Sequence, residues 1–356
     1  MASRIGIVTW QGKFNYGNRL QNYATCQIYQ ELGCEPINLI LQCDGPIIKI
    51  KTCIKTLIGK QEQSRESAMN PERLDAFDSF NRNLSFQVIH SFRDKQLEQF
   101  DFFSVGSDTI WNLSDKPFFD EWRYLLFCEP SKRIALAPSF GSDVMSKTQM
   151  KHLSRYVKDY PCLSTREDSG VELIRQASGR NAVALCDPTL VLEAADWRRV
   201  ADDRLTPDYP YVFAYLLGER SAEVDAALDY ALCNAASSIV MLSDKDGDGE
   251  LPAGPAEFIS LVENASHVIT DSFHGAVFAA LFERPLTVVH RIEGGVPNDR
   301  LFTRLDNLTH KLGLENRVMG SKAFDFKRAG DYDYVHQAIE GERFNFLSYL
   351  EACLNA

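Results

Sequence analysis

The chain has 356 residues, of which 45% are hydrophobic and 24% charged, and its formal net charge is -11. This length exceeds what one hydrophobic core usually holds, so we expect a globular protein of two domains. The acidic balance argues against nucleic acid as a partner, because a phosphate backbone needs a basic face, but it allows a local basic pocket for a small anion.

The cysteines and the apolar runs bear on the compartment. Nine cysteines without a Cys-x-x-Cys spacing predict scattered reduced thiols rather than disulfides or a zinc site, and we expect no metal or cofactor. Apolar runs stay short of the roughly 18 residues of a spanning helix, and the first residues lack the pattern of a signal peptide. We therefore expect a cytoplasmic protein.

The first element is a strand followed by a helix. An apolar run at 4–10 breaks into Asn15, Gly17 and Asn18, and a helical stripe with a four-residue period follows, ended by Gly33. Strand-like runs then alternate with helical patterns at 35–40, 100–106, 132–140, 160–166 and 182–187. This alternation predicts a parallel α/β sheet.

The alternation stops in a charged stretch at 194–209 and resumes with strand-like runs at 211–217, 238–243, 267–270 and 286–290. We predict an N-terminal Rossmann-like domain at 1–193 with a lid or insert at 41–75, a linker at 194–209, a C-terminal Rossmann-like domain at 210–325, and a helical segment at 326–356 that could pack across either domain. Two doubly wound domains of this kind face each other across a cleft, and ligands bind at the carboxyl ends of their strands.

Polar residues follow these strands at the expected places. They are Asn15, Gly17 and Asn18, then Asp108, Trp111 and Asn112, then Arg166, and finally Ser272, His274 and Gly275. A ring that follows a strand is a sugar-stacking candidate, although Trp111 also fits a core position.

Two of these residues have alternative interpretations. His274 stands at a predicted helix N-terminus, which favours an anion, but the same stretch also fits a capping loop with Asp271 or Ser272 as N-cap. Arg166 opposes the dipole of the helix it precedes, so it calls for a bound anion or for an acidic partner at the surface, Glu167 or Asp187. Thr165 and Asp168 have the spacing of a capping box.

The ordered set NYGNRLQNYA, VGSDTIWN, KRIALAPSFGSD, STREDSG, CDPTLVL, VITDSFHGAVFAALFERPL and TRLDNLTHKLGL resembles the polysaccharide pyruvyl transferase family over roughly residues 4–314. The resemblance implies a fold similar to glycosyltransferase B, with phosphoenolpyruvate as donor substrate and a sugar as acceptor. The product it implies is a pyruvate ketal that bridges two hydroxyls of one sugar in a surface polysaccharide precursor.

The resemblance also implies roles for the candidate residues. His274 matches the family histidine, here the acid that protonates the donor methylene, and Asp108 matches the carboxylate that deprotonates the sugar hydroxyl. Arg166 matches the donor-binding arginine, and Arg304 is a second choice. The donor side includes Ser272 and Gly275, and the acceptor side Asn15, Gly17, Asn18, Trp111 and Asn112.

One departure concerns the donor phosphate. Many sequences similar to this one carry Arg-x-His before the glycine, whereas this chain has Ser272 two residues before His274. Serine donates one hydrogen bond but no charge, so Arg291 or Arg304 would have to supply it.

Two further stretches invite a functional interpretation. Residues 244–250 imitate the start of an EF-hand loop, but Pro255 stands where the bidentate glutamate belongs, which favours an acidic turn. Residues 45–60 carry lysines and no acid, beside an apolar face. Either they touch the inner face of a membrane to reach a lipid-linked acceptor, or they form a lid helix over the cleft.

Two other functions share the predicted fold. A nucleotide-sugar glycosyltransferase needs an acidic residue for a ribose and a basic pocket for a diphosphate, and the chain shows no clear pair. A non-catalytic glycan-binding protein needs neither His274 nor Arg166, and both are present. The acceptor sugar and the oligomeric state are left open by the sequence.

Overall fold

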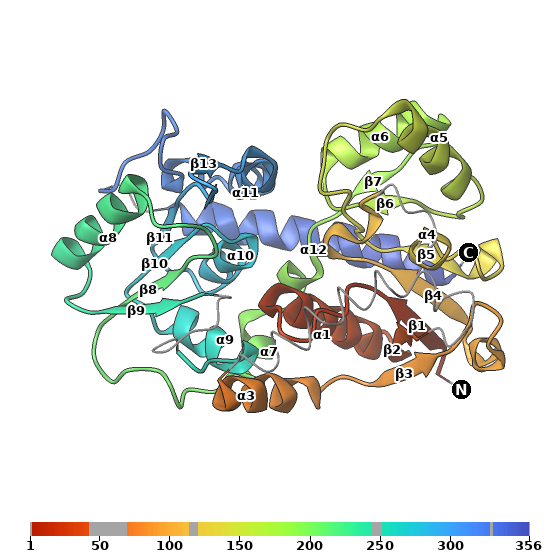
Figure 1. Ribbon diagram of the computed structural model, residues 1–356, viewed down its shortest axis with the longest axis horizontal. Coiled ribbons are helices and arrows are strands. Elements are labelled where there is room, and N and C mark those ends of the chain that lie inside the picture. Colours follow the sequence, from red (N-terminus) through yellow and green to blue (C-terminus); the bar gives the residue numbers. More distant parts are fainter. Residues whose placement is uncertain (1, 43–69, 114–119, 244–250, 328–329, 356) are drawn as a thin grey trace.

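The computed structural model describes residues 2–42, 70–113, 120–243, 251–327 and 330–355. Its two lobes each contain a parallel sheet (Figure 1). The predicted insert at 41–75 lies mostly outside the described residues, as do the basic stretch at 45–60 and the EF-hand-like turn at 244–250.

The N-terminal sheet has five parallel strands in the order β3-β2-β1-β4-β5. They are β1 (Arg4–Val8), β2 (Glu35–Leu41), β3 (Phe86–Ile89), β4 (Phe102–Val105) and β5 (Arg133–Ala135). Apolar residues of β1 and β4 are buried, as expected for strands covered on both faces. The strand order reverses between β1 and β4, which makes the loops after these two strands the ligand-binding crevice of a doubly wound sheet.

The C-terminal sheet has four parallel strands in the order β11-β10-β8-β9. They are β8 (Val212–Tyr215), β9 (Ile239–Leu242), β10 (His267–Thr270) and β11 (Leu286–Val288). The strand order reverses between β8 and β10. The prediction of two Rossmann-like domains is confirmed by these two sheets.

The helices between the strands include α1 (Tyr16–Glu31) and α3 (Pro71–Asn81) in the first domain, and α8 (Ala222–Asn234), α9 (Pro255–Glu263), α10 (Phe273–Leu281) and α11 (Asp299–Lys311) in the second. Shorter elements are α4 (Asp120–Arg123), the hairpin β12 (Ile292–Glu293) and β13 (Val296–Pro297), and 3₁₀ helices at Lys95–Gln99, Asp108–Trp111, Pro130–Lys132, Pro188–Leu190 and Glu315–Arg317. Within the described ranges, no helix has the length and hydrophobicity to cross a membrane.

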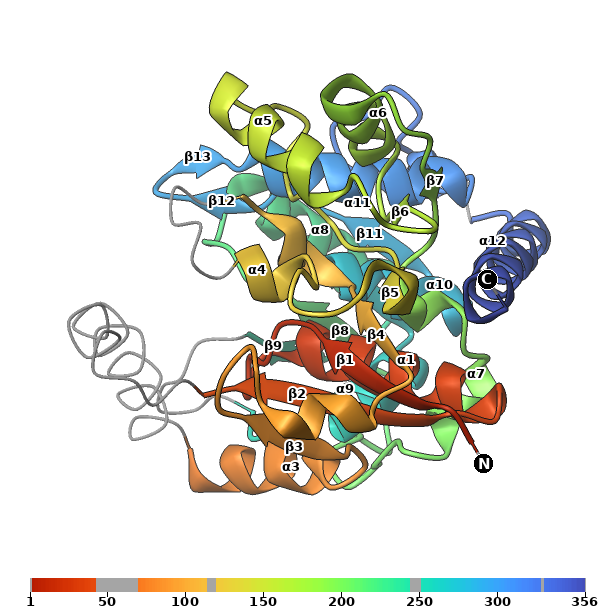
Figure 2. The same cartoon turned by 90° about the vertical axis from the view of Figure 1, so that its right-hand side faces the viewer.

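The sequence pattern suggested that the runs at 160–166 and 182–187 extend the main sheet, but in the structure they do not. They form a separate two-stranded sheet of β6 (Ser164–Thr165) and β7 (Val183–Ala184), which packs with α5 (Lys147–Tyr156) and α6 (Asp168–Ser178). In Figure 2 this subdomain and α3 lie on opposite sides of the N-terminal sheet. The subdomain brings Arg166 to the cleft.

The two domains share one hydrophobic core. Tyr16 packs against Phe77 of α3 and against Tyr215 and Phe258 of the second domain, at ring distances of 4.9, 5.7 and 5.7 Å. Its hydroxyl donates to the carbonyl of Ala253 at 2.6 Å. The cleft is therefore bounded by a buried apolar contact that holds the domains together.

Two segments cross between the domains. The stretch at 194–209 is not only an extended linker, because it contains α7 (Ala194–Arg198), whose Trp197 is fully buried between Tyr23 and Phe278. The C-terminal helix α12 (Tyr332–Leu354) runs along both lobes (Figure 1). Its Tyr332 donates to a carbonyl of the second domain, and its Tyr349 to the carbonyl of Ala135 in β5.

Candidate active site

The crevices of the two sheets meet at the first turns of α1 and α10. A Cβ placed on Gly17 would lie 2.4 Å from Nδ1 and 2.5 Å from Cε1 of His274, closer than real Cβ contacts come. Glycine at position 17 therefore lets α1 approach the imidazole across the domain boundary. We predicted that the small loop leaves space for a ligand, and the structure shows that its glycine leaves space for the histidine.

The neighbouring asparagines are held by protein contacts. Asn15 is the N-cap of α1, and its side chain accepts from the Asn18 amide N–H at 2.9 Å. Asn18 is buried, and its Nδ2 donates to Oδ2 of Asp108 at 2.6 Å. Asn18 thus links α1 to the loop after β4. Binding of an acceptor by Asn15, Gly17 and Asn18 stays a prediction.

Asp108 lies where the first domain, the Arg166 subdomain and α11 meet. Its φ of +54° is in the left-handed region. Its Oδ1 accepts from the Thr109 N–H at 2.8 Å and lies 3.7 Å from Nη1 of Arg304 and 4.0 Å from Nη2 of Arg166. The carboxylate is 20% exposed and lies near both cations, and its role as a base stays a prediction.

Arg166 is paired with the acids that the sequence offered as surface partners, but the pair is buried. Its side chain is 3% exposed, with Nη1 2.9 Å from Oδ2 of Asp187 and Nη2 3.5 Å from Oε1 of Glu167. Burial opposes its charge, but Glu167, Asp187 and Asp108 together raise the pKa of Arg166 above its usual value. The expected capping box is absent, since Glu167 is the N-cap of α6 and Thr165 Oγ1 donates to the Glu167 carbonyl.

His274 lies in the first turn of α10, as predicted. The alternative of a simple capping loop fits poorly, because the N-cap Ser272 makes no side-chain cap bond. Asp271 instead binds the loop after β8, accepting from Leu217 and Gly218 N–H groups at 2.9 and 2.7 Å. Burial is the largest influence on His274 and lowers its pKa. The charges of Asp187 and Asp108 raise this pKa and those of Arg166 and Arg304 lower it, and the net shift is downward. The imidazole is therefore mostly neutral at pH 7.

Gly275 has a packing role. A Cβ there would lie 2.3 Å from Oγ1 of Thr270, so only glycine lets α10 lie this close to the end of β10. Thr270 in turn donates to the Tyr215 carbonyl at 2.7 Å and accepts from the Ser272 N–H at 3.0 Å. Donor binding by Ser272 and Gly275 stays a prediction.

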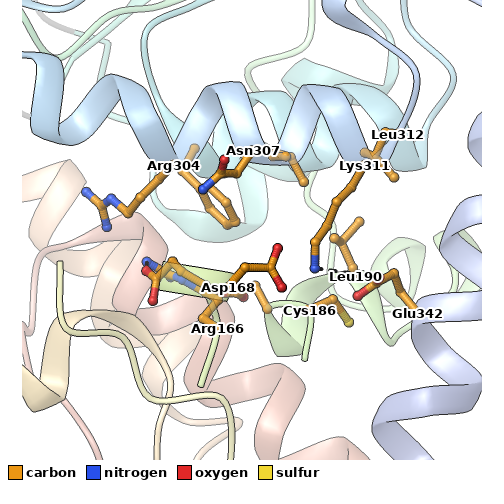
Figure 3. A pocket seen from close by; sticks show the side chains of 13 residues that line it. Arg166, Asp168, Cys186, Leu190, Arg304, Asn307, Lys311, Leu312 and Glu342 are labelled. Atoms are coloured by element: carbon orange, nitrogen blue, oxygen red, sulfur yellow. Dashed lines mark hydrogen bonds and ion pairs between the residues drawn. The ribbon is translucent and has the colours of Figure 1, made fainter. Parts of the chain in front are cut away.

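The two arginines that could replace the missing Arg-x-His arginine lie differently. Arg304 on α11 lines the same pocket as Arg166 and Asp168 (Figure 3). Burial and the nearby Arg166 lower the pKa of Arg304. Arg291 pairs with Asp271, with Nε 3.7 Å from Oδ2 and Nη2 donating to the Asp271 carbonyl at 3.3 Å. Arg304 is therefore the better placed of the two to bind a donor beside Arg166.

Trp111 takes the core position that the sequence also allowed, and its burial contradicts the alternative that it stacks on a sugar. Its ring is fully buried, stacked on Tyr124 at 4.9 Å and packed against Phe140 and Tyr160, and its Nε1 donates to the Arg123 carbonyl. A large aromatic side chain that fills a core has no face left for a ligand. Asn112, the next residue, is exposed, and its role as an acceptor contact stays a prediction.

A pocket adjoins Arg166, and it includes residues that the sequence did not single out. On α11, Asn307 and Lys311 follow Arg304 along the face that lines it, and Glu342 of α12 lies opposite (Figure 3). Lys311 Nζ lies 3.7 Å from Oε1 of Glu342. The spacing of Arg304, Asn307 and Lys311 is the helical i, i+3, i+7 pattern, which could have identified this face in the sequence.

Several buried nitrogen atoms in this cluster make no hydrogen bond to the described residues: Nε and Nη2 of Arg166, Nε of Arg304 and Nε2 of His274. Unpaired buried donors are costly, by about 1 to 3 kcal/mol each, so such groups usually serve a ligand or water. Guanidinium groups match carboxylate and phosphate oxygens in geometry and charge. The cluster suits a small anion with more than one charged oxygen group.

Fold and site together define a two-domain α/β protein in which two arginines and a histidine gather where the switch points of its two sheets meet. The chain belongs to the polysaccharide pyruvyl transferase family, whose model matches residues 15–290, more than three quarters of its length. That family is one of transferases. The match covers both crevices, from Asn15 at the first turn of α1 to His274 on α10.

Other comparisons add less. No curated protein matches the chain in sequence. Among solved structures, the N-terminal domain of trehalose-6-phosphate phosphatase from Candida albicans is 10% identical, covers 100% of this chain and 94% of its own, and gives a TM-score of 0.40. The wall teichoic acid polymerase TagF is 10% identical, with 99% and 83% coverage and a TM-score of 0.41.

The glycosyltransferase SnogD from Streptomyces nogalater is 13% identical, with 100% and 98% coverage and a TM-score of 0.38. TM-scores below 0.5 do not establish a common fold. The two-domain architecture follows from the strand orders above.

Proposed function

We propose that this protein transfers the enolpyruvyl group of phosphoenolpyruvate to a sugar, releases phosphate, and forms a pyruvate ketal on a surface polysaccharide precursor. The family supports a pyruvyl transfer. The observation that carries the choice of donor is the convergence of Arg166, Arg304 and His274, with unpaired buried nitrogens, on one place. A donor with a carboxylate and a phosphate would supply the acceptors that these nitrogens lack.

The reaction divides into steps that this cluster can serve. A proton added to the donor methylene makes the central carbon electrophilic, one sugar hydroxyl adds to that carbon, phosphate leaves, and a second hydroxyl closes the ketal. Arg166 and Arg304 bind the anionic groups, and Asp108, 20% exposed, takes the proton of the incoming hydroxyl. His274 is the acid for the methylene, a role worth about 100- to 10,000-fold.

The state of His274 in the unliganded protein adds a condition. Burial keeps the pKa of this imidazole below its usual value, so it carries little charge at neutral pH. An anionic donor beside it favours the imidazolium, because a nearby negative charge raises the pKa of a cationic acid. Donor binding would thus be coupled to proton uptake, and His274 would become an acid in the complex.

Ligand-dependent stabilisation tests the donor. Phosphoenolpyruvate at 100 times its dissociation constant should stabilise the protein by about 2.7 kcal/mol, while nucleotide sugars should not. The effect should be lost in Arg304→Ala and kept in Arg175→Ala, a control at an exposed ion pair on α6. Stabilisation by a nucleotide sugar but not by phosphoenolpyruvate would overturn the proposal in favour of a glycosyltransferase. Stabilisation by neither, with glycan binding, would favour a non-catalytic binding protein.

The proposal also covers the acceptor and the place where the enzyme meets it. We propose a cytoplasmic enzyme whose acceptor is a sugar, with a lipid-linked oligosaccharide as one form, reached through contact of residues 45–60 with the inner face of a membrane. Flotation with liposomes tests the contact. Absence of binding, with and without anionic lipid, would remove the membrane step and leave the donor assignment intact.

A further inference from the structure

We propose that Asp187 is a positioning residue for this reaction: its buried carboxylate favours protonation of His274 across the domain boundary and fixes the direction of the Arg166 guanidinium. The inference rests on the proposed function. The sequence suggested Asp187 only as a surface partner for Arg166. In the structure, the Asp187 carboxylate lies between Arg166, the proposed donor-binding arginine, and His274, the proposed acid.

The carboxylate is fully buried and its hydrogen-bonding capacity is filled. Oδ2 accepts from Ser107 Oγ at 3.0 Å and from Arg166 Nη1 at 2.9 Å. Oδ1 accepts from the Thr189 N–H at 3.1 Å and from Thr189 Oγ1 at 2.8 Å. Two oxygens with two donors each leave no lone pair for a further strong bond. Asp187 is therefore rigid and ionised, and burial is outweighed by His274 and Arg166, so its pKa lies below the usual value.

His274 lies on the other side of this carboxylate. Its Nε2 is 3.9 Å from Oδ1 of Asp187, within ion-pair reach but too long for a hydrogen bond. Among the described residues, Nε2 has no hydrogen-bond partner. Asp187 thus acts on the imidazole through its charge, while the Nε2–H of a protonated His274 stays available to the donor.

The charges facing His274 decide what Asp187 does. From the loop after β4 comes Asp108, from the β6 end Arg166, from α11 Arg304, and from the loop after β7 Asp187. Asp187 and Asp108 favour the imidazolium against the charges of the two arginines, so without Asp187 only Asp108 opposes them at His274. The imidazolium is then disfavoured. The loss of an opposite charge at this distance should lower the pKa of the imidazole by about 1 to 3 units.

A purely structural Asp187 would explain its four hydrogen bonds without involving His274. The two accounts differ in one observable, the protonation of His274. Asp187→Asn keeps the shape and removes the charge. We expect the titration of His274, followed by NMR of histidine-labelled protein and assigned by its loss in His274→Gln, to move to lower pH by about 1 to 3 units. This readout needs neither donor nor acceptor.

Thr189→Val is the second variant, because it removes one hydroxyl from Oδ1 and keeps the carboxylate. With fewer donors to share its charge, Asp187 should move the titration of His274 toward higher pH, the opposite direction. In turnover of phosphoenolpyruvate, the pH profile of kcat/KM should follow both shifts, with Asp187→Asn recovering activity at lower pH.

The proposal would be overturned if the titration of His274 moved in neither variant. A loss of rate in Asp187→Asn that does not depend on pH would also overturn it. If Asp187→Asn does not fold, the direction measured in Thr189→Val decides alone. Failure of the wild type to use phosphoenolpyruvate would refute the donor assignment instead, and the titration would still report on Asp187 and His274.

Discussion

Gly17→Ala is the substitution that tests the meeting of the two domains most sharply. The added Cβ would lie 2.4 Å from Nδ1 of His274, and an ordinary contact begins near 3.4 Å, so ring and helix must separate by about 1 Å. A displacement of this size at a catalytic group costs about 100-fold in rate. Alanine favours the helix by up to about 1 kcal/mol, while overpacking costs about 1 to 3 kcal/mol, so stability should change little or fall slightly.

The assay measures kcat for phosphate release together with the free energy of unfolding of the same preparation. Gly341→Ala in the exposed middle of α12 is the matched control, because nothing lies within 4 Å of its added Cβ. It should keep full activity and gain about 1 kcal/mol of stability. If Gly17→Ala were fully active and as stable as Gly341→Ala, His274 would not be packed against α1, and the site as described would be refuted.

Three further predictions concern stability and protonation. Trp111→Ala should destabilise the protein by about 3 to 5 kcal/mol, measured by denaturant unfolding, and leave the acceptor KM unchanged, whereas a selective rise in KM would restore the sugar-stacking role. Arg166→Ala should cost about 3 to 5 kcal/mol in the same assay, because Asp187 is left buried without its cation; a neutral effect would show the pair to be solvated. His267, buried against Thr287 with its pKa lowered to about 4 by burial, binds a proton only in the unfolded chain between pH 6.5 and 4. Stability should therefore fall by about 3 kcal/mol as pH decreases through this window, and His267→Gln should remove that loss in unfolding curves; an unchanged loss would assign it to other groups.

The sheets were predictable because their signals are local. Buried parallel strands such as β1 and β10 are short apolar runs, and the turns after them are polar in the sequence itself. Since two doubly wound domains face each other across the carboxyl ends of their strands, the residues after those strands were expected to meet, and Asp108 and His274 do lie in one cluster. Arg166 joins them from the separate β6–β7 sheet. The prediction needed no knowledge of side-chain direction.

The predictions that failed depend on the direction of a side chain or on contacts between residues far apart in the sequence. Trp111 follows a strand as Asp108 does, but the 3₁₀ turn carries its ring into the core beside Tyr124, which spacing alone does not reveal. Gly17 was expected to face a ligand. The group that requires a glycine there is the imidazole of His274, which is more than 250 residues away in the chain. Asp187 was missed as a site residue because a buried carboxylate and a surface partner have the same local sequence.

The measurement that tests the central claim most directly is phosphate release from phosphoenolpyruvate in the presence of acceptors containing galactose, glucose, mannose and N-acetylmannosamine. Wild type is compared with His274→Ala and Arg166→Ala, and the sugar product is examined by mass spectrometry for one added pyruvate ketal. The account predicts release that depends on an acceptor and is lost in both variants. Acceptor-dependent release that persists in both variants would contradict the site, and no release with any acceptor, together with no binding of phosphoenolpyruvate, would contradict the donor.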